Sequence, residues 1–161
     1  MAENRFDFYI PHWEELPEIE LYLEQVIKYL EDHLEPFHAD RSEKIITKAM
    51  VNNYVKHGVL KPPVKKKYNK SHIAYLFVIS LMKQVYSIND IKILIRLALG
   101  VAPIEASYNK FCDVLKESIE CIFANKAYVA EERTGKGRHL LKCATQSYAN
   151  KLYVQRVFLN K

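Results

Sequence analysis

The expected fold of this chain depends on residues 47–70, which read TKAMVNNYVKHGVLKPPVKKKYNK. This stretch predicts a short helix after Thr47, because a threonine side chain can accept a hydrogen bond from N–H groups of the next turn. The helix should end at Gly58, since glycine readily adopts the left-handed conformation that closes helices. Two prolines at 62–63 exclude a helical continuation, so we expect residues 61–68 to form a short hairpin or an extended wing.

The rest of the chain predicts an all-α fold. The 161 residues suffice for one domain with a real core, and the apolar content of 49% is that of a folded globule. Only four glycines and six prolines are present, which disfavours a turn-rich sheet. Apolar residues recur at helical spacing over residues 17–34, 71–84, 87–99, 104–127 and 139–159, and more weakly over residues 43–46.

Residues outside these helices are expected to form an arm and connections. Residues 1–16 combine aromatic and acidic side chains, and we expect an extended arm that packs on the body or on a partner subunit. We predict a flexible hinge at residues 134–137, which read TGKG. The final helix should bury a heptad-like stripe that includes Leu141, Tyr148 and Leu159.

Charge is distributed very unevenly along the chain. Residues 1–40 carry a net charge of −9, residues 41–72 carry +8, and residues 73–161 carry +6, within a total of +5. A concentrated basic segment is typical of proteins that bind polyanions. A lysine-rich surface that is merely solvated usually mixes charges of both signs, whereas the basic segment holds a single acid among nine bases.

Several other classes of protein are disfavoured. The longest apolar run, residues 73–82, is shorter than the ~20 residues that a bilayer requires, and we expect a buried core helix there and no membrane partner. The acidic, proline-broken N-terminus does not resemble a signal peptide, so we expect a cytoplasmic protein. Cys112, Cys121 and Cys143 lack metal-site spacing and are expected to be reduced thiols. Catalytic motifs are missing too, and we expect no enzyme activity, no cofactor and no metal.

The order of these features resembles the winged helix-turn-helix of MerR-type regulators over residues 43–95. In that family the second helix begins with Ser or Thr and ends near Tyr and Gly-Leu-Leu, the wing closes on a tyrosine, and a later helix starts with a Ser-Leu motif. The matching positions here are Thr47, Asn53, Tyr54, Gly58, Val59, Leu60 and Tyr68, followed by Ser87, Ile88, Asn89, Asp90 and Ile91. The resemblance implies an all-α, MerR-like winged fold with additional C-terminal helices.

The chain also resembles a bacterial family, domain of unknown function 1836, over roughly residues 5–155. Its T-K-x-M-x-N-N-Y-V-K core appears here at residues 47–56, and its K-K-Y segment appears at residues 66–68. Differences from MerR-type proteins are some forty residues ahead of Thr47, and Ala49 and Asn52 where the larger family often has arginines. The long dimer helix and the metal-binding cysteines of metal sensors have no counterpart, so metal sensing is not implied.

These resemblances, with the basic segment, predict a homodimeric DNA-binding transcription regulator. Its parts would be an N-terminal arm (1–16), a winged helix-turn-helix DNA-binding region (17–100) and a C-terminal helical region (101–161), packed as one unit. The recognition helix 47–57 would read double-stranded DNA in the major groove, and the wing 61–68 would contact phosphates. The predicted DNA-binding residues are Thr47, Lys48, Asn52, Asn53, Tyr54, Lys56, Lys61, Lys65, Lys66, Lys67 and Lys70.

The individual residues have different expected roles. Asparagine can make a bidentate contact with adenine, whereas lysines neutralise phosphates. The ring of Tyr54 suits the apolar face of its helix, although its hydroxyl could instead reach a phosphate. We expect Tyr68 in the core, and His57 and His72 on the surface.

Two questions stay open at this stage. The alternative to a DNA binder is a protein-interaction adaptor that keeps the winged fold without DNA, with the acidic N-terminal segment pairing with the basic patch of a second copy. Residues 104–159 would build either a dimer interface or a pocket for an unidentified small-molecule effector.

Overall fold

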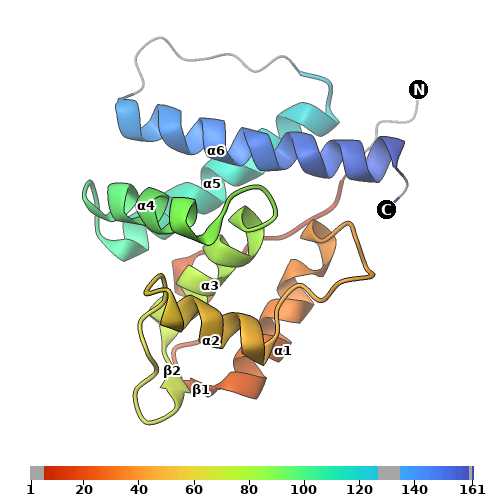
Figure 1. Ribbon diagram of the computed structural model, residues 1–161. Helices are drawn as coiled ribbons and strands as arrows, with labels where there is room; N and C mark the ends of the chain where they lie inside the picture. The colour runs from red at the N-terminus through yellow and green to blue at the C-terminus, as the bar shows by residue number, and fades with distance from the viewer. Residues whose placement is uncertain (1–5, 127–134, 160) are drawn as a thin grey trace.

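The computed structural model describes residues 6–126, 135–159 and 161, and its fold is mainly helical (Figure 1). The all-α class is confirmed, with one small two-stranded sheet added to it. The elements in chain order are η1 (Trp13–Glu15), β1 (Leu21–Tyr22), α1 (Leu23–Leu34), η2 (Glu35–Phe37), α2 (Lys48–Lys56), β2 (Lys67–Tyr68), α3 (Lys70–Met82), α4 (Ile88–Leu99), α5 (Ile104–Phe123), α6 (Lys136–Tyr153) and a π-helical turn, η3 (Val154–Phe158).

Helix α3 lies at the centre of the molecule. It is apolar on all sides, and residues such as Ile73, Leu76 and Phe77 are almost completely buried, as expected for a helix enclosed by others. Helices α1, α4, α5 and α6 all pack against it. The predicted buried core helix is therefore confirmed.

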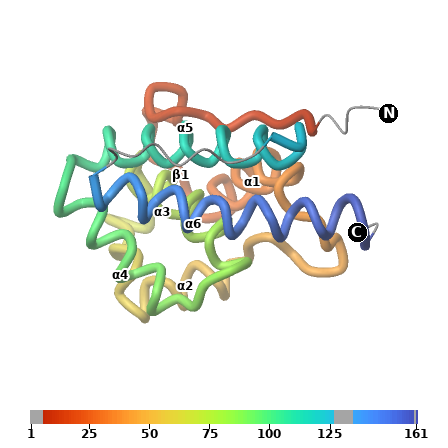
Figure 2. The backbone as a smooth tube through the Cα atoms, turned by 90° about the horizontal axis from the view of Figure 1, so that it is seen from above, coloured from red at the N-terminus to blue at the C-terminus, as the bar shows by residue number. Residues whose placement is uncertain are grey.

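Helices α5 and α6 pack along one another on one side of α3 (Figures 1 and 2). The hydroxyls of Ser118 and Thr145 form a hydrogen bond of 2.9 Å inside this interface. Tyr148 on α6 reaches further and donates a hydrogen bond to the carbonyl of Phe37, in the turn η2. Helix α6 is thus tied both to α5 and to the segment that follows α1.

The N-terminal segment packs on the body, as predicted for the part of it that the structure describes. Phe6 stacks on Phe123 of α5, with ring centroids 5.0 Å apart. The hydroxyl of Tyr108 on α5 donates a 2.9 Å hydrogen bond to the Pro11 carbonyl. Trp13 packs edge-on against Tyr108.

The predicted start of the first helix is wrong. Helix α1 begins at Leu23, because Leu21 and Tyr22 form strand β1, which pairs antiparallel with β2 in the register Leu21 to Tyr68. The side chain of Gln25 accepts a hydrogen bond from the Tyr22 N–H and so caps the N-terminus of the helix. Ile19 lies outside the helix and is 71% exposed, so it does not belong to the apolar stripe.

Other features also differ from the prediction. Residues 43–46 are not helical, although Ile46 is buried. Within the predicted hinge, Lys136 and Gly137 belong to α6, while residue 134 lies outside the described residues. Leu159 follows the π-helical turn and is 56% exposed, so the buried stripe of the last helix ends before it.

Candidate nucleic-acid interface

Helix α2 starts and ends where the sequence predicts. The Thr47 hydroxyl accepts a hydrogen bond of 3.2 Å from the Met50 N–H, which caps the first turn. At the other end, Gly58 has a φ of +67°, and the N–H groups of Val59 and Leu60 both donate to the Tyr54 carbonyl. These bonds satisfy the last turn and set the direction in which the chain leaves the helix.

Helix α2 has one buried side and one exposed side. Val51 and Tyr54 are buried against the core. Four of the exposed positions, Ala49, Asn52, Asn53 and Lys56, have the i, i+3, i+4, i+7 spacing that places them along a single face. Tyr54 is only 3% exposed, and burial raises the pKa of its hydroxyl, so its ring belongs to the core. The two asparagines therefore lie at the centre of a polar surface on a short helix.

Residues 64–67 form a tight hairpin turn made almost entirely of lysines. Val64 and Lys67 exchange two backbone hydrogen bonds, of 3.1 and 2.9 Å. Lys65 and Lys66, the two residues between them, both have positive φ, as a type I′ turn requires. The side chains of this pair are exposed at the tip. The predicted hairpin is confirmed.

The hairpin is fixed to the body through Lys67 and Tyr68. Both residues pair with β1, and the Lys67 ammonium lies 5.6 Å from the centre of the Tyr22 ring. Tyr68 is buried, as predicted. Figure 1 places the hairpin and α2 at the same end of the molecule, opposite α6.

The predicted surface position of His72 is wrong, whereas His57 is exposed as predicted. His72 is buried beside Tyr68, its Nδ1 lies 2.8 Å from the side-chain oxygen of Asn69, and its Nε2 lies 3.3 Å from the Pro62 carbonyl. It therefore joins the start of α3 to the loop ahead of the hairpin. Asn69, the capping residue three positions earlier, is the only local signal of this role.

Two of the candidate lysines already have carboxylate partners. Lys48 forms an ion pair of 2.5 Å with Glu24 on α1, and its hydrogen bond lowers the pKa of Glu24. Lys70 pairs with Glu18, lies over the Trp13 ring and is mostly buried. The acidic N-terminal segment thus contacts the basic segment within one chain, which the sequence alone does not reveal.

Four other candidate lysines are exposed and could contact a polyanion without first leaving a carboxylate partner. Lys56, Lys61, Lys65 and Lys66 are exposed, and within the described residues no carboxylate lies within ion-pair distance of them. They lie on α2, in the loop that follows it and at the hairpin tip, at the same end of the molecule as the two asparagines (Figure 1).

Helix α4 contacts the end of α2 through Lys92, a residue that sequence reasoning missed. Its ammonium donates a hydrogen bond of 3.1 Å to the His57 carbonyl, one of the last carbonyls of the α2 turn. The same group lies 3.2 Å from the place that a Cβ at Gly58 would occupy. A lysine near a helix C-terminus stabilises the carbonyls that have no partner within the helix.

Within the described residues, no three His, Cys, Asp or Glu side chains gather closely enough to hold a metal ion. The three cysteines are free thiols. Among the helices that the structure describes, none has the length and apolar character needed to cross a membrane.

The described residues define a mainly helical protein whose polar surface helix lies beside a lysine-rich hairpin. The chain belongs to the family described as domain of unknown function (DUF1836), whose model matches residues 11–111. The family resemblance is confirmed, over a shorter stretch than residues 5–155, since the match ends within α5 and leaves out α6. No curated protein and no solved structure matches the chain.

Proposed function

We propose that this protein binds double-stranded DNA as a transcription regulator, with α2 in the major groove and the hairpin of residues 61–68 on the adjacent phosphates. The observation that carries the proposal is the exposed face of Ala49, Asn52, Asn53 and Lys56 beside the hairpin tip. Their arrangement puts hydrogen-bonding side chains at the centre and positive charge at the edge.

The asparagine face suits base recognition. A major groove admits one α-helix, and an asparagine side chain can both accept from and donate to the edge of an adenine. Small Ala49 on the same face allows the helix to approach the base edges closely. Asn52 and Asn53 are therefore the proposed base-reading residues.

The lysines suit phosphate contacts, which supply most of the affinity of DNA-binding proteins. Lys56, Lys61, Lys65 and Lys66 would make them directly. Lys48 and Lys70 would have to exchange their carboxylate partners for phosphates, so their contributions to affinity should be smaller. Lys67 is held over the Tyr22 ring and would act mainly by positioning the hairpin.

The order β1, α1, α2, hairpin and α3 supports the proposal, because it resembles the winged helix-turn-helix of MerR-type regulators. One helix of this length makes few base contacts, and regulators of this type bind two-fold symmetric sites as dimers. The proposal therefore includes a homodimer in the bacterial cytoplasm, and it assigns no catalytic step to the protein.

The test is a fluorescence-anisotropy titration of labelled duplex at several salt concentrations, after selection of bound fragments from genomic DNA. Affinity should fall with salt, with a log–log slope of about −0.9 for each phosphate contacted. Lys65→Gln with Lys66→Gln should make that slope shallower by up to about 2. The matched control, Lys116→Gln with Lys126→Gln, removes the same charge from the region of α5 and should change much less.

Undetectable binding at low salt would overturn the proposal, as would an equal loss in the control pair. Undetectable binding would favour the alternative, an adaptor that keeps this fold without binding DNA. For such an adaptor the acidic segment would pair with a second copy, whereas Glu24 and Glu18 pair with lysines of their own chain.

A further inference from the structure

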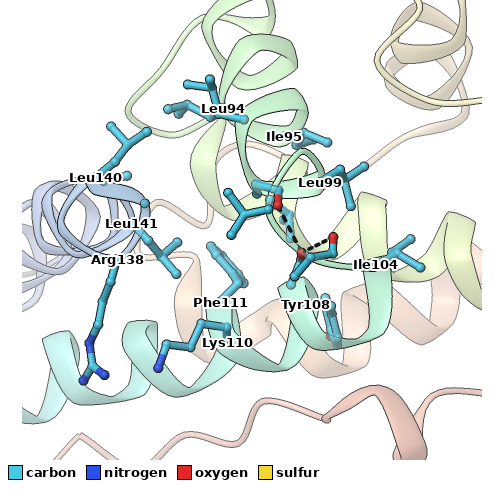
Figure 3. Close-up of a pocket in the computed structure, with 18 of the residues that line it drawn as sticks. Leu94, Ile95, Leu99, Ile104, Tyr108, Lys110, Phe111, Arg138, Leu140 and Leu141 are labelled. Atoms are coloured by element: carbon cyan, nitrogen blue, oxygen red, sulfur yellow. Dashed lines mark hydrogen bonds between the residues drawn. The ribbon is translucent and has the colours of Figure 1, made fainter. Parts of the chain in front are cut away.

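A large apolar cavity lies between α3, α4, α5 and α6 (Figure 3). Its volume is about 390 Å³, within the range of small-molecule sites. Aliphatic side chains form most of the wall, chiefly Leu94, Ile95, Leu97, Leu99, Ile104 and Leu141. Leu97 is 52% exposed and Val101 80% exposed, so this apolar surface is left open to water.

The uncharged polar side chains in the wall are those of Tyr75 on α3 and of Ser107 and Tyr108 on α5. The hydroxyls of Ser107 and Tyr108 are used internally, since Ser107 donates to the Ala102 carbonyl and Tyr108 donates to the Pro11 carbonyl. The charged residues among the described ones that line the cavity are Lys110 on α5 and Arg138 on α6, both cationic. Figure 3 shows that these two side chains extend on the same side of the cavity.

We propose that this cavity binds an aliphatic carboxylate of the fatty-acid class. The hydrocarbon chain would occupy the space between α4, α5 and α6, and the carboxylate would lie beside Lys110. An aliphatic wall offers a hydrocarbon chain burial without polar groups to desolvate. Lys110 at this edge, with no acid among the described lining residues, favours an anionic end group over a neutral or cationic one.

A ligand here would also affect the opposite side of α4. Leu94 and Ile95 line the cavity, and Lys92 on the same helix donates to the His57 carbonyl at the end of α2. A ligand that binds one position of α4 better than another shifts the population toward that position. This coupling rests on the proposed function, whereas ligand binding itself does not.

The experiment uses the full chain, decanoate as the anionic probe and decanol as its neutral counterpart, both below the concentrations at which they aggregate. Isothermal titration calorimetry gives the stoichiometry. Trp13, the only tryptophan in the chain, packs against Tyr108 of the cavity wall and reports binding by its fluorescence. We expect saturable binding of one decanoate per chain, about tenfold tighter than decanol because of the charge-assisted hydrogen bonds.

Variants separate the cavity from general adsorption. Ala98 lines the cavity and is exposed, so Ala98→Phe should fill the space without disturbing the core and should abolish binding of both probes. Leu97→Gln is a second wall variant and should weaken both. Lys110→Gln should weaken decanoate by about fivefold to tenfold and leave decanol unchanged, whereas Lys126→Gln should change neither.

Three results would overturn the inference: no saturable binding, binding that survives both wall variants, or equal affinity for decanoate and decanol. Repeating the DNA titration with and without decanoate tests the coupling. Decanoate binding without any DNA binding would reject the proposed function alone, and DNA binding without decanoate binding would reject the cavity alone.

Discussion

At the scale of single residues, Asn52 and Asn53 are poor choices for helix stability at their positions in α2. Both are exposed in the middle of α2, and asparagine is a poor helix former. The core cannot explain their presence, because Val51 and Tyr54 form the buried side. A binding role at the surface gives these two residues a physical reason.

Replacing both asparagines by alanine should separate stability from DNA binding. We expect Asn52→Ala with Asn53→Ala to raise the free energy of unfolding by about 1 kcal/mol, from helix propensity alone. Affinity for a selected duplex should fall at least tenfold, while affinity for random duplex stays nearly unchanged. Denaturant unfolding and anisotropy titrations measure the two quantities. The control is Asn89→Ala, in the first turn of α4, which should leave the preference for the selected duplex intact. If the double variant also retains that preference, α2 does not read bases.

Glu24 is the residue whose removal should strengthen DNA binding. Its carboxylate forms an ion pair with Lys48 and adds negative charge beside α2. We expect Glu24→Gln to raise affinity for duplex DNA severalfold at low salt and less at high salt, since screening weakens the repulsion that is removed. Glu105→Gln removes the same charge at the start of α5 and should change affinity much less. Equal effects of the two variants would show that net charge, rather than this ion pair, is responsible.

The same ion pair predicts a small pH effect on stability. Lys48 holds the pKa of Glu24 below its usual value. The pair's contribution to stability is therefore complete above the unfolded-state pKa and is lost as the pH falls through the folded-state pKa. Comparing acid unfolding of the wild-type chain and the Glu24→Gln variant should show a shallower fall in stability for the variant. Identical acid profiles would mean that the pair contributes nothing measurable.

At the scale of elements, the hairpin carries two lysines in a backbone conformation that L-residues with long side chains seldom adopt. Positive φ at Lys65 and Lys66 costs about 1 kcal/mol each, whereas Asn-Gly fits a type I′ turn without this cost. Lys65→Asn with Lys66→Gly should therefore raise the free energy of unfolding by about 2 kcal/mol and weaken DNA binding by removing two cations. The Lys65→Gln, Lys66→Gln pair loses the same charge without the gain in stability. Equal stability of the two double variants would contradict the turn assignment.

The elements that could be predicted from the sequence are those with local signals. Thr47, Gly58 and the two prolines define α2 and the loop after it, and these signals lie within a few residues of the structure they determine. Strand β1 has no comparable signal, because its two residues directly precede a stretch of helical apolar periodicity and its partner β2 is far along the chain. The pairing of β1 with β2, a tertiary contact, therefore determines that residues 21–22 form a strand.

The candidate site divides in the same way. The exposed asparagines and the lysine hairpin follow from local sequence, and the structure places them as expected. Glu24, Glu18 and Lys92 could not be found, because each meets its partner only after α1, α3 and α4 have packed. Buried His72 was missed although its partner Asn69 is local, because its burial also depends on the Tyr68 ring and the Pro62 carbonyl.

At the scale of the whole molecule, α6 is joined to two segments that lie far apart in the chain. It packs along α5, and its residue Tyr148 reaches the turn after α1. The core is a single cluster that extends from Ile10 to Leu152. A helix outside the family match is therefore part of the same core as the matched region.

Tyr148 provides the test of this integration. Its side chain is almost completely buried, and its hydroxyl donates to the Phe37 carbonyl, so Tyr148→Phe leaves a buried carbonyl without that partner. We expect the free energy of unfolding to fall by about 1 to 2 kcal/mol. If the chain unfolds as one unit, far-ultraviolet circular dichroism and Trp13 fluorescence should shift to the same extent, although the N-terminal segment that contains Trp13 runs on the other side of α5 from α6 (Figure 2). Tyr153→Phe on the same helix is the matched control, since its hydroxyl has no hydrogen-bond partner among the described residues, and its effect should stay within about 0.5 kcal/mol. A shift in the dichroism signal alone would instead mean that α6 unfolds separately from the family-matched body.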